Sequence, residues 1–194
     1  MQTSVATALA LTTFLFLLSP VQAALFPPIE GLSLQTKSPL NVTPDPSKKA
    51  VVLVFLSVKC PCSRGHVPEI QKLSKQYPQF QFVGVHSNLD ETLEQTQEYF
   101  KAQGLGFPVI QDDNTKTANA WKALKTPHVF VVSPDGNVLY KGGVSDSAKF
   151  ENASQFYLRE ALEDLAHDRS VKTAQTRVLG CVIERGENTN VWKK

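Results

Sequence analysis

The most informative part of the sequence is residues 50–76, AVVLVFLSVKCPCSRGHVPEIQKLSKQ. Its first part, Ala50 to Ser57, is almost continuously apolar and rich in β-branched residues, which is the pattern of a strand covered on both faces. Its second part, Pro61 to Gln76, has apolar residues at helical spacing and a proline in the first turn, where the missing N–H costs nothing. We therefore predict a central parallel strand that leads directly into a helix.

Cys60 lies at the join between this strand and this helix. The unpaired backbone N–H groups and the dipole at a helix N-terminus stabilise negative charge. Lys59 adds a positive neighbour, and this combination raises the thiolate fraction of a cysteine. We therefore predict that Cys60 is a reactive nucleophile whose pKa lies below the ~8.5 of a free cysteine.

The alternation of strands and helices continues along the chain. The predicted elements are a strand at 79–86, an amphipathic helix at 91–103, an extended piece at 107–110, a short helix at 115–124, a strand at 126–133, a strand at 138–141 and a closing helix at 151–167. The last two strands are joined by a tight turn and form an antiparallel hairpin. A hairpin that follows a parallel unit predicts an α/β fold with a mixed central sheet flanked by helices.

One domain accounts for the 194 residues, because a single hydrophobic core stops growing near ~250 residues. Residues 24–47 are rich in proline, serine and threonine and are predicted to be an irregular lead-in. The domain is predicted to span residues 48–168, and residues 169–194 form a C-terminal tail that carries Cys181. The 20 basic and 18 acidic residues are scattered, which argues against a nucleic-acid partner.

The N-terminus has the pattern of a cleavable export signal. No charged side chain occurs from Met1 to Gln22, and the apolar run from Ala8 to Leu18 is shorter than the ~20 residues that span a bilayer. We predict a signal peptide over residues 1–23, a mature N-terminus at Ala24 and no membrane span after cleavage. The protein is therefore expected to be exported, either to a periplasm or to the exterior.

Export places the three cysteines, Cys60, Cys62 and Cys181, in an oxidising compartment. Three cysteines form at most one intramolecular disulfide at a time and leave one thiol over, which suits exchange chemistry better than a structural staple. Cys181 lies in the apolar segment from Val178 to Ile183. This setting suggests that the tail packs against the domain in an extended conformation.

The segment VLVFLSVKCPCSRGHVPEI, residues 52–70, resembles the active-site segment of the thioredoxin superfamily, especially its exported TlpA-like and AhpC/TSA-type redoxins. Gly106 to Val109, Lys125 to Phe130 and Pro134 to Gly136 resemble later landmarks of the same family. The resemblance covers roughly Ala50 to Leu165, most of the mature chain. It implies a thioredoxin-like fold that needs no cofactor and no metal.

The same resemblance implies roles for particular residues. Cys60 matches the attacking cysteine of the family's CxxC motif, and Pro68 matches the proline that kinks the following helix. Pro127, which follows Thr126, matches the cis-proline that faces the active site. These three roles are carried over from the family and do not follow from composition or spacing.

The C-P-C-S segment departs from the family's CxxC motif. Counting from Cys60, the second cysteine of that motif falls on Ser63, and Cys62 stands one place early. The carboxylate that TlpA-like relatives place before the helix proline is His66 here, and the strand before Cys60 offers no acid. Proton transfer is therefore assigned to water or to a histidine. The candidate histidines are His66, His86 and His128.

The leading functional hypothesis is a thiol-disulfide oxidoreductase. Cys60 would attack a substrate disulfide, and Cys181 or Cys62 would resolve the mixed disulfide. A Gly-Cys segment near the C-terminus occurs in some exported redoxins, which favours a resolving role for Cys181. The expected partners are protein thiols or disulfides and a redox partner protein.

Two other functions compete with this one. A thiol peroxidase would oxidise Cys60 to sulfenic acid, but Leu53 stands where peroxiredoxins carry a proline, although Ser57 matches their pattern. A Cu(I)-handling protein would use Cys62 and His66, which share a helix face, but related copper-delivery redoxins use a CxxxC spacing.

Overall fold

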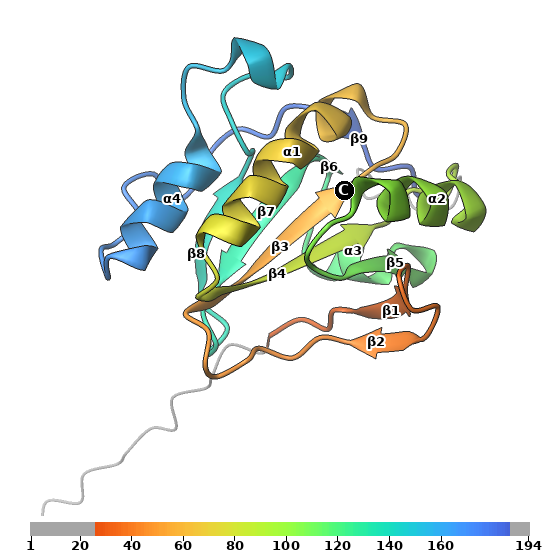
Figure 1. Ribbon diagram of the computed structural model, residues 1–194, viewed down its shortest axis with the longest axis horizontal. Helices are drawn as coiled ribbons and strands as arrows, with labels where there is room; N and C mark the ends of the chain where they lie inside the picture. Colours follow the sequence, from red (N-terminus) through yellow and green to blue (C-terminus); the bar gives the residue numbers. More distant parts are fainter. Residues whose placement is uncertain (1–25, 187–194) are drawn as a thin grey trace, which may run out of the picture.

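The computed structural model describes residues 26–186 (Figure 1). The predicted signal peptide over residues 1–23 and the predicted mature N-terminus at Ala24 lie outside this range. No helix between residues 26 and 186 is long and apolar enough to cross a membrane.

The described part of the chain forms a thioredoxin-like α/β fold of strands and helices in alternation. The strands are β1 Glu30–Ser33, β2 Pro39–Asn41, β3 Ala50–Leu56, β4 Phe80–His86, β5 Val109–Asp112, β6 Lys125–Thr126, β7 His128–Val132, β8 Val138–Gly142 and β9 Cys181–Val182. The α-helices are α1 Pro61–Gln76, α2 Leu93–Gln103, α3 Lys116–Ala120 and α4 Tyr157–Ala166, with short 3-10 helices at Asp113–Thr115 and Phe150–Asn152. The predicted strand and helix of residues 50–76 are confirmed as β3 and α1.

Seven strands form one mixed sheet in the order β2-β1-β5-β4-β3-β7-β8. The predicted central strand β3 pairs parallel with β4 and antiparallel with β7, and all of its residues are buried. Successive side chains of a strand point to opposite faces, so β3 contributes Val52 and Val54 to one core and Val51 and Leu53 to the other. The first core packs against α1, α2 and α4, and the second packs against α3 and the tail.

The N-terminal segment differs from its prediction. Residues 24–47, predicted to be an irregular lead-in, contain β1 and β2, which extend the sheet beyond β5 (Figure 1). These strands are only three and four residues long, so they carry too little alternation to be recognised, and their pairing with β5 defines them. The sheet edge tolerates Pro39 at the first position of β2, because an edge strand leaves part of its backbone unpaired.

Helix α2 begins later than predicted, at Leu93 instead of Glu91. Thr92 caps it, because its side chain accepts the Gln95 N–H while the Gln95 side chain accepts the Thr92 N–H. Glu91 therefore belongs to the loop between β4 and α2. It is buried there, and it enters the site described below.

The tail returns to the domain and adds a second, small sheet. Strand β9 pairs antiparallel with β6, and the register places Cys181 opposite Thr126. Ile183 is buried in the core on the far face of the sheet, and its N–H donates to the Leu124 carbonyl at 3.0 Å. Figure 1 shows β9 and β6 near the point where β3 ends and α1 begins.

Candidate active site

Cys60 is the N-cap residue of α1 and has an extended backbone conformation. Its thiol is 1% exposed and lies 3.2 Å from the Thr126 carbonyl oxygen, to which it donates. Its sulfur accepts the Ser63 N–H at 3.4 Å, which is one of the unpaired donors of the first helical turn. The strand-to-helix junction therefore fixes Cys60 where the sequence places it, and the residue is almost completely buried.

Cys181 meets Cys60 although the two residues are 121 positions apart. Because Cys181 stands opposite Thr126 in the small sheet, its N–H reaches the Cys60 sulfur at 3.4 Å. Cys181 itself is exposed, and both cysteines are present as free thiols. The structure thus brings the predicted nucleophile and one of its two predicted resolving partners into contact.

Burial and hydrogen bonding have opposite effects on the pKa of Cys60. Burial opposes ionisation, but hydrogen bonds from the Cys181 thiol and from the Ser63 N–H outweigh burial and hold the pKa of Cys60 below its ordinary value. Burial and the hydrogen bond to Cys60 raise the pKa of Cys181 to about 12. Of the two thiols, Cys60 is therefore the one that ionises more readily.

Lys59 does not take the role predicted for it. Its ammonium group forms an ion pair with Asp90 at 3.0 Å on the surface, and it also donates to the Asp90 carbonyl. The groups that lower the Cys60 pKa are hydrogen-bond donors within the fold. The position of Lys59 next to Cys60 in the sequence suggested an effect on the Cys60 pKa, but its long side chain reaches the Asp90 carboxylate instead.

Cys62 contacts the tail. Its thiol donates to the Leu179 carbonyl at 3.2 Å, and burial, followed by the charge of Cys60, raises its pKa to about 11. His66, one turn further along α1, has both ring nitrogens engaged: Nδ1 lies 2.7 Å from the Cys62 carbonyl oxygen and Nε2 lies 2.8 Å from the Ser145 hydroxyl. A histidine held in this way has no free nitrogen to offer a metal ion.

A buried carboxylate, Glu91, lies against the loop that leads into Cys60. It accepts hydrogen bonds from the Ser57 hydroxyl at 2.5 Å and from the Val58 N–H at 2.7 Å, and His86 Nε2 lies 2.8 Å from it. Burial opposes ionisation of Glu91, but the hydrogen bonds from His86 and Ser57 outweigh burial and hold its pKa below the ordinary value. The Ser57 hydroxyl accepts the Cys60 N–H at 2.9 Å, so one side chain connects Glu91 to the nucleophile.

The sequence reading missed Glu91. No acid lies on β3, as predicted, but the loop before α2 supplies one. The available signal was the pattern Thr-x-x-Gln at residues 92–95, which marks a capping box and so places the residue before it outside the helix. His86, one of the three candidate histidines, is the buried partner of this acid.

The remaining predicted residues lie in α1 and in the segment that runs from β6 to β7. The Thr126–Pro127 peptide bond is cis, and the Thr126 backbone contacts both cysteines. Ser63 accepts the Ser57 N–H at 3.0 Å and so ties the helix to the preceding loop. His128 follows on β7, where burial and then the charge of Lys141 lower its pKa to about 4.

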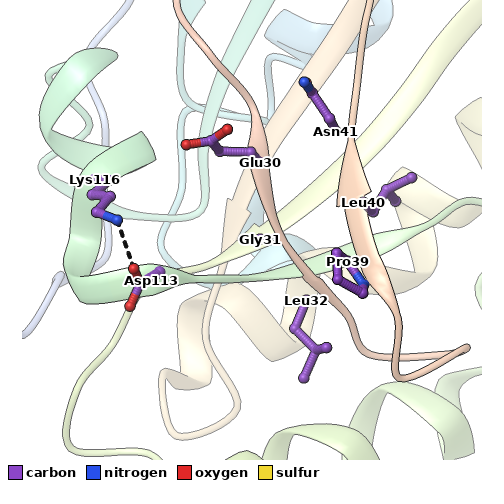
Figure 2. Close-up of a pocket in the computed structure, with 8 residues that line it drawn as sticks. All are labelled: Glu30, Gly31, Leu32, Pro39, Leu40, Asn41, Asp113 and Lys116. Atoms are coloured by element: carbon purple, nitrogen blue, oxygen red, sulfur yellow. Dashed lines mark hydrogen bonds and ion pairs between the residues drawn. The ribbon is translucent and has the colours of Figure 1, made fainter.

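A pocket elsewhere on the molecule lies over β1, β2 and the loop after β5, with an ion pair between Lys116 and Asp113 on one side (Figure 2). None of the predicted site residues lines it. The candidate site is therefore the cysteine cluster, which lies at the N-terminus of α1 and in the separate small sheet of β6 and β9.

Comparisons with known proteins agree with the fold. Residues 48–138 match the family described as Thioredoxin-like. Over 95 residues, or 47% of the chain, the sequence is 28% identical to a protein of Bacillus subtilis named Thiol-disulfide oxidoreductase ResA, and it spans about half (51%) of that relative's length.

Two solved structures share the fold over most of the chain. An uncharacterized conserved protein from Geobacillus kaustophilus has a TM-score of 0.75 and 24% identity, covering 84% of this chain and 91% of that one. A hypothetical protein from Sinorhizobium meliloti has a TM-score of 0.75 and 22% identity, covering 88% and 97%. At these identities the two structures support the architecture alone.

Proposed function

We propose that the protein is an exported thiol-disulfide oxidoreductase whose redox couple is Cys60 and Cys181, in keeping with the match of residues 48–138 to the family described as Thioredoxin-like. Cys60 supplies the thiolate of this couple. The oxidised state is the disulfide between the two cysteines, and the reduced state is the hydrogen-bonded pair described above. Protein thiols and disulfides are the substrates, and a second redox protein restores the starting state.

One observation carries this proposal: the small sheet of β6 and β9 holds Cys181 against the Cys60 sulfur. A bridge between them closes a loop of roughly 120 residues, which contributes about 5 kcal/mol to stability in the chain-entropy model. The lowered pKa of Cys60 and the raised pKa of Cys181 favour a nucleophile and a proton carrier side by side.

Cys62 is the alternative resolving cysteine, and its contacts support a different role. Its thiol donates to the tail backbone at Leu179, and its raised pKa leaves it protonated near neutral pH. We assign it to holding the tail in place. The copper hypothesis also depends on Cys62 together with His66, and the engaged ring of His66 favours the redox assignment over copper binding.

Peptide mapping tests the assignment of the couple. Protein oxidised with diamide, alkylated and digested with trypsin should yield the peptide Cys60–Arg64 joined to the peptide Val178–Arg185. The Cys62→Ser variant should keep this joined species and should still reduce the disulfides of insulin with dithiothreitol as electron source. Loss of the joined species in Cys62→Ser, or its absence from the unaltered protein, would overturn the assignment.

Export is the second part of the proposal, and it is supported by the uncharged, apolar N-terminal run. Sequencing the N-terminus of protein recovered from outside the cytoplasm should give Ala24 as the first residue. Exported protein that still begins at Met1 would contradict cleavage after residue 23.

A further inference from the structure

The three thiols differ sharply in their accessibility. Cys60 is 1% exposed and Cys62 is 7% exposed, whereas Cys181 is exposed. Strand β9 covers Cys60, because the Cys181 N–H contacts the Cys60 sulfur while Thr126 and Ser63 contact it from the domain. A partner protein that approaches this site therefore meets Cys181 first.

Exposed hydrophobic residues flank Cys181. Residues 26–186 contain five large hydrophobic side chains that are exposed, namely Leu89, Leu93, Leu124, Val138 and Val182. Three of these five belong to the surroundings of β9: Val182 is part of it, Leu124 accepts the Ile183 N–H, and the Leu89 N–H donates to the Glu184 carbonyl. Exposed apolar side chains gathered around a reactive group are typical of a protein-docking surface.

From these two observations we propose that electrons enter the protein through Cys181, delivered by a dithiol protein that docks on the apolar surface around β9. This proposal rests on the Cys60–Cys181 couple proposed above. The partner then forms its mixed disulfide with Cys181, and Cys60 is the leaving group.

The exchange balances in two steps. A thiolate of the partner attacks the Cys181 sulfur of the disulfide, the bond between Cys181 and Cys60 breaks, and its electron pair leaves with Cys60 as a thiolate. The partner's second thiol then attacks the partner's first sulfur, which is bonded to Cys181 in the mixed disulfide. This releases Cys181, which takes up a proton. The partner dithiol is oxidised to a disulfide, the couple is reduced, and the partner's other proton goes to solvent.

The electrostatics of the site agree with this direction of attack. Disulfide exchange is faster when the departing thiol has the lower pKa. Burial opposes a thiolate at Cys60, but the Ser63 and Cys181 backbone N–H groups that donate to its sulfur stabilise the thiolate as it departs. Burial, together with the hydrogen bond to Cys60 in the reduced protein, raises the pKa of Cys181. Accessibility and leaving-group strength therefore favour the same sulfur as the point of attack.

Glutathione serves as the probe, with the full mature chain in its diamide-oxidised form. The protein is mixed with glutathione, quenched with N-ethylmaleimide within seconds and digested with trypsin. We expect glutathione on the peptide Val178–Arg185 and N-ethylmaleimide on Cys60, with at least a tenfold excess over the reverse labelling. The measurement is repeated on the Cys62→Ser variant, in which only one disulfide can form. If that variant does not fold, the labelling ratio is taken from the unaltered chain.

The Gly180→Ala variant tests whether β9 provides the shielding. Gly180 has a φ of +147°, and a Cβ added there would collide with the Thr126 carbonyl oxygen. Displacing β9 should expose Cys60 and lower the labelling ratio severalfold. Gly106→Ala is the matched control, because a Cβ there has no atom within 4 Å.

The outcomes separate this inference from the function it rests on. Absence of the joined Cys60–Cys181 peptide before glutathione is added would remove the couple itself. A joined peptide followed by glutathione on Cys60, or evenly on both cysteines, would leave the couple intact and overturn the entry through Cys181. A labelling ratio in Gly180→Ala equal to that in Gly106→Ala would overturn the shielding by β9.

Discussion

Cys60 closely follows a strand whose seven residues are all buried, whereas Cys181 stands in a two-residue strand whose residues are both exposed. The first strand pairs on both sides within a seven-stranded sheet, and the second pairs on one side with another two-residue strand. Regions with few buried contacts open at a lower free-energy cost than the core. The site therefore joins a fixed sulfur to one that is held on a segment able to open by itself.

The tail is nevertheless held by a defined set of contacts. Ile183 is buried in the core, the Glu184 N–H donates to the Asn88 side chain at 2.9 Å, and the Cys62 thiol donates to the Leu179 carbonyl. These contacts position Cys181 but bury little apolar area compared with β3. Four experiments probe this difference between the two regions.

The largest expected effect comes from removing the fixed sulfur. Cys60→Ser should abolish insulin reduction, because a hydroxyl at this position is not ionised near neutral pH and cannot form the disulfide. Its fold should persist, since the change is nearly isosteric. Circular dichroism serves as the control for folding, and residual turnover well above that of an uncatalysed mixture would contradict the assignment of the nucleophile.

The next largest effect concerns the acid beneath the fixed region. Glu91→Ala should cost about 3–5 kcal/mol of unfolding free energy at neutral pH, because it leaves His86, the Ser57 hydroxyl and the Val58 N–H without their partner. Since the folded pKa of Glu91 is below its unfolded value, this stabilisation is present above about pH 4.3 and is lost as the pH falls. Urea unfolding at neutral and acidic pH measures both.

Glu98→Ala on the exposed face of α2 is the matched control and should change the unfolding free energy by no more than about 0.5 kcal/mol. A gap between the two variants that stays the same from pH 7 to pH 3 would show that the contribution of Glu91 does not depend on its charge.

A pair of apolar truncations compares the two regions directly. Leu53→Ala in β3 removes a fully buried side chain and should cost about 2–5 kcal/mol of global stability. Ile183→Ala removes one of similar size that is 2% exposed, but it should cost less globally, because the tail can open while the sheet stays folded. Urea unfolding gives the global values, and amide hydrogen exchange at residues 181–183 should accelerate in the second variant. Equal global losses would make the tail part of the cooperative core.

The smallest effect concerns the hydrogen bond between the two thiols. In a Cys62→Ser background, Cys181→Ala removes the donor and should raise the pKa of Cys60, whereas Cys181→Ser keeps a hydroxyl donor and should raise it less. Thiolate absorbance at 240 nm as a function of pH measures both values. Identical titrations of the two variants would mean that the backbone N–H groups alone stabilise the thiolate.

The same two regions differ in how far the sequence predicts them. The strand and helix around Cys60 follow from a long apolar run and helical spacing, and α1 has the predicted limits Pro61–Gln76. The contact of Cys181 with Thr126 is a pairing between two very short strands, which leaves no periodic signal. The placement of Glu91 depends on where the capping box starts α2, and the short strands β1 and β2 depend on β5. Local sequence patterns thus predicted β3, α1 and the position of Cys60, whereas the position of Cys181 depends on long-range strand pairing.

The register of β9 has a consequence for insertions and deletions. Cys181 and Ile183 stand two positions apart in an extended segment, so one can contact Cys60 while the other enters the core. A residue inserted between them would turn one of the two side chains to the opposite side. Residues 169–173 carry no helix or strand and lie largely on the surface, so length changes there can be absorbed. In variants of this chain we expect the spacing from Cys181 to Ile183 to stay constant, whereas the length of the connection at residues 169–173 can vary.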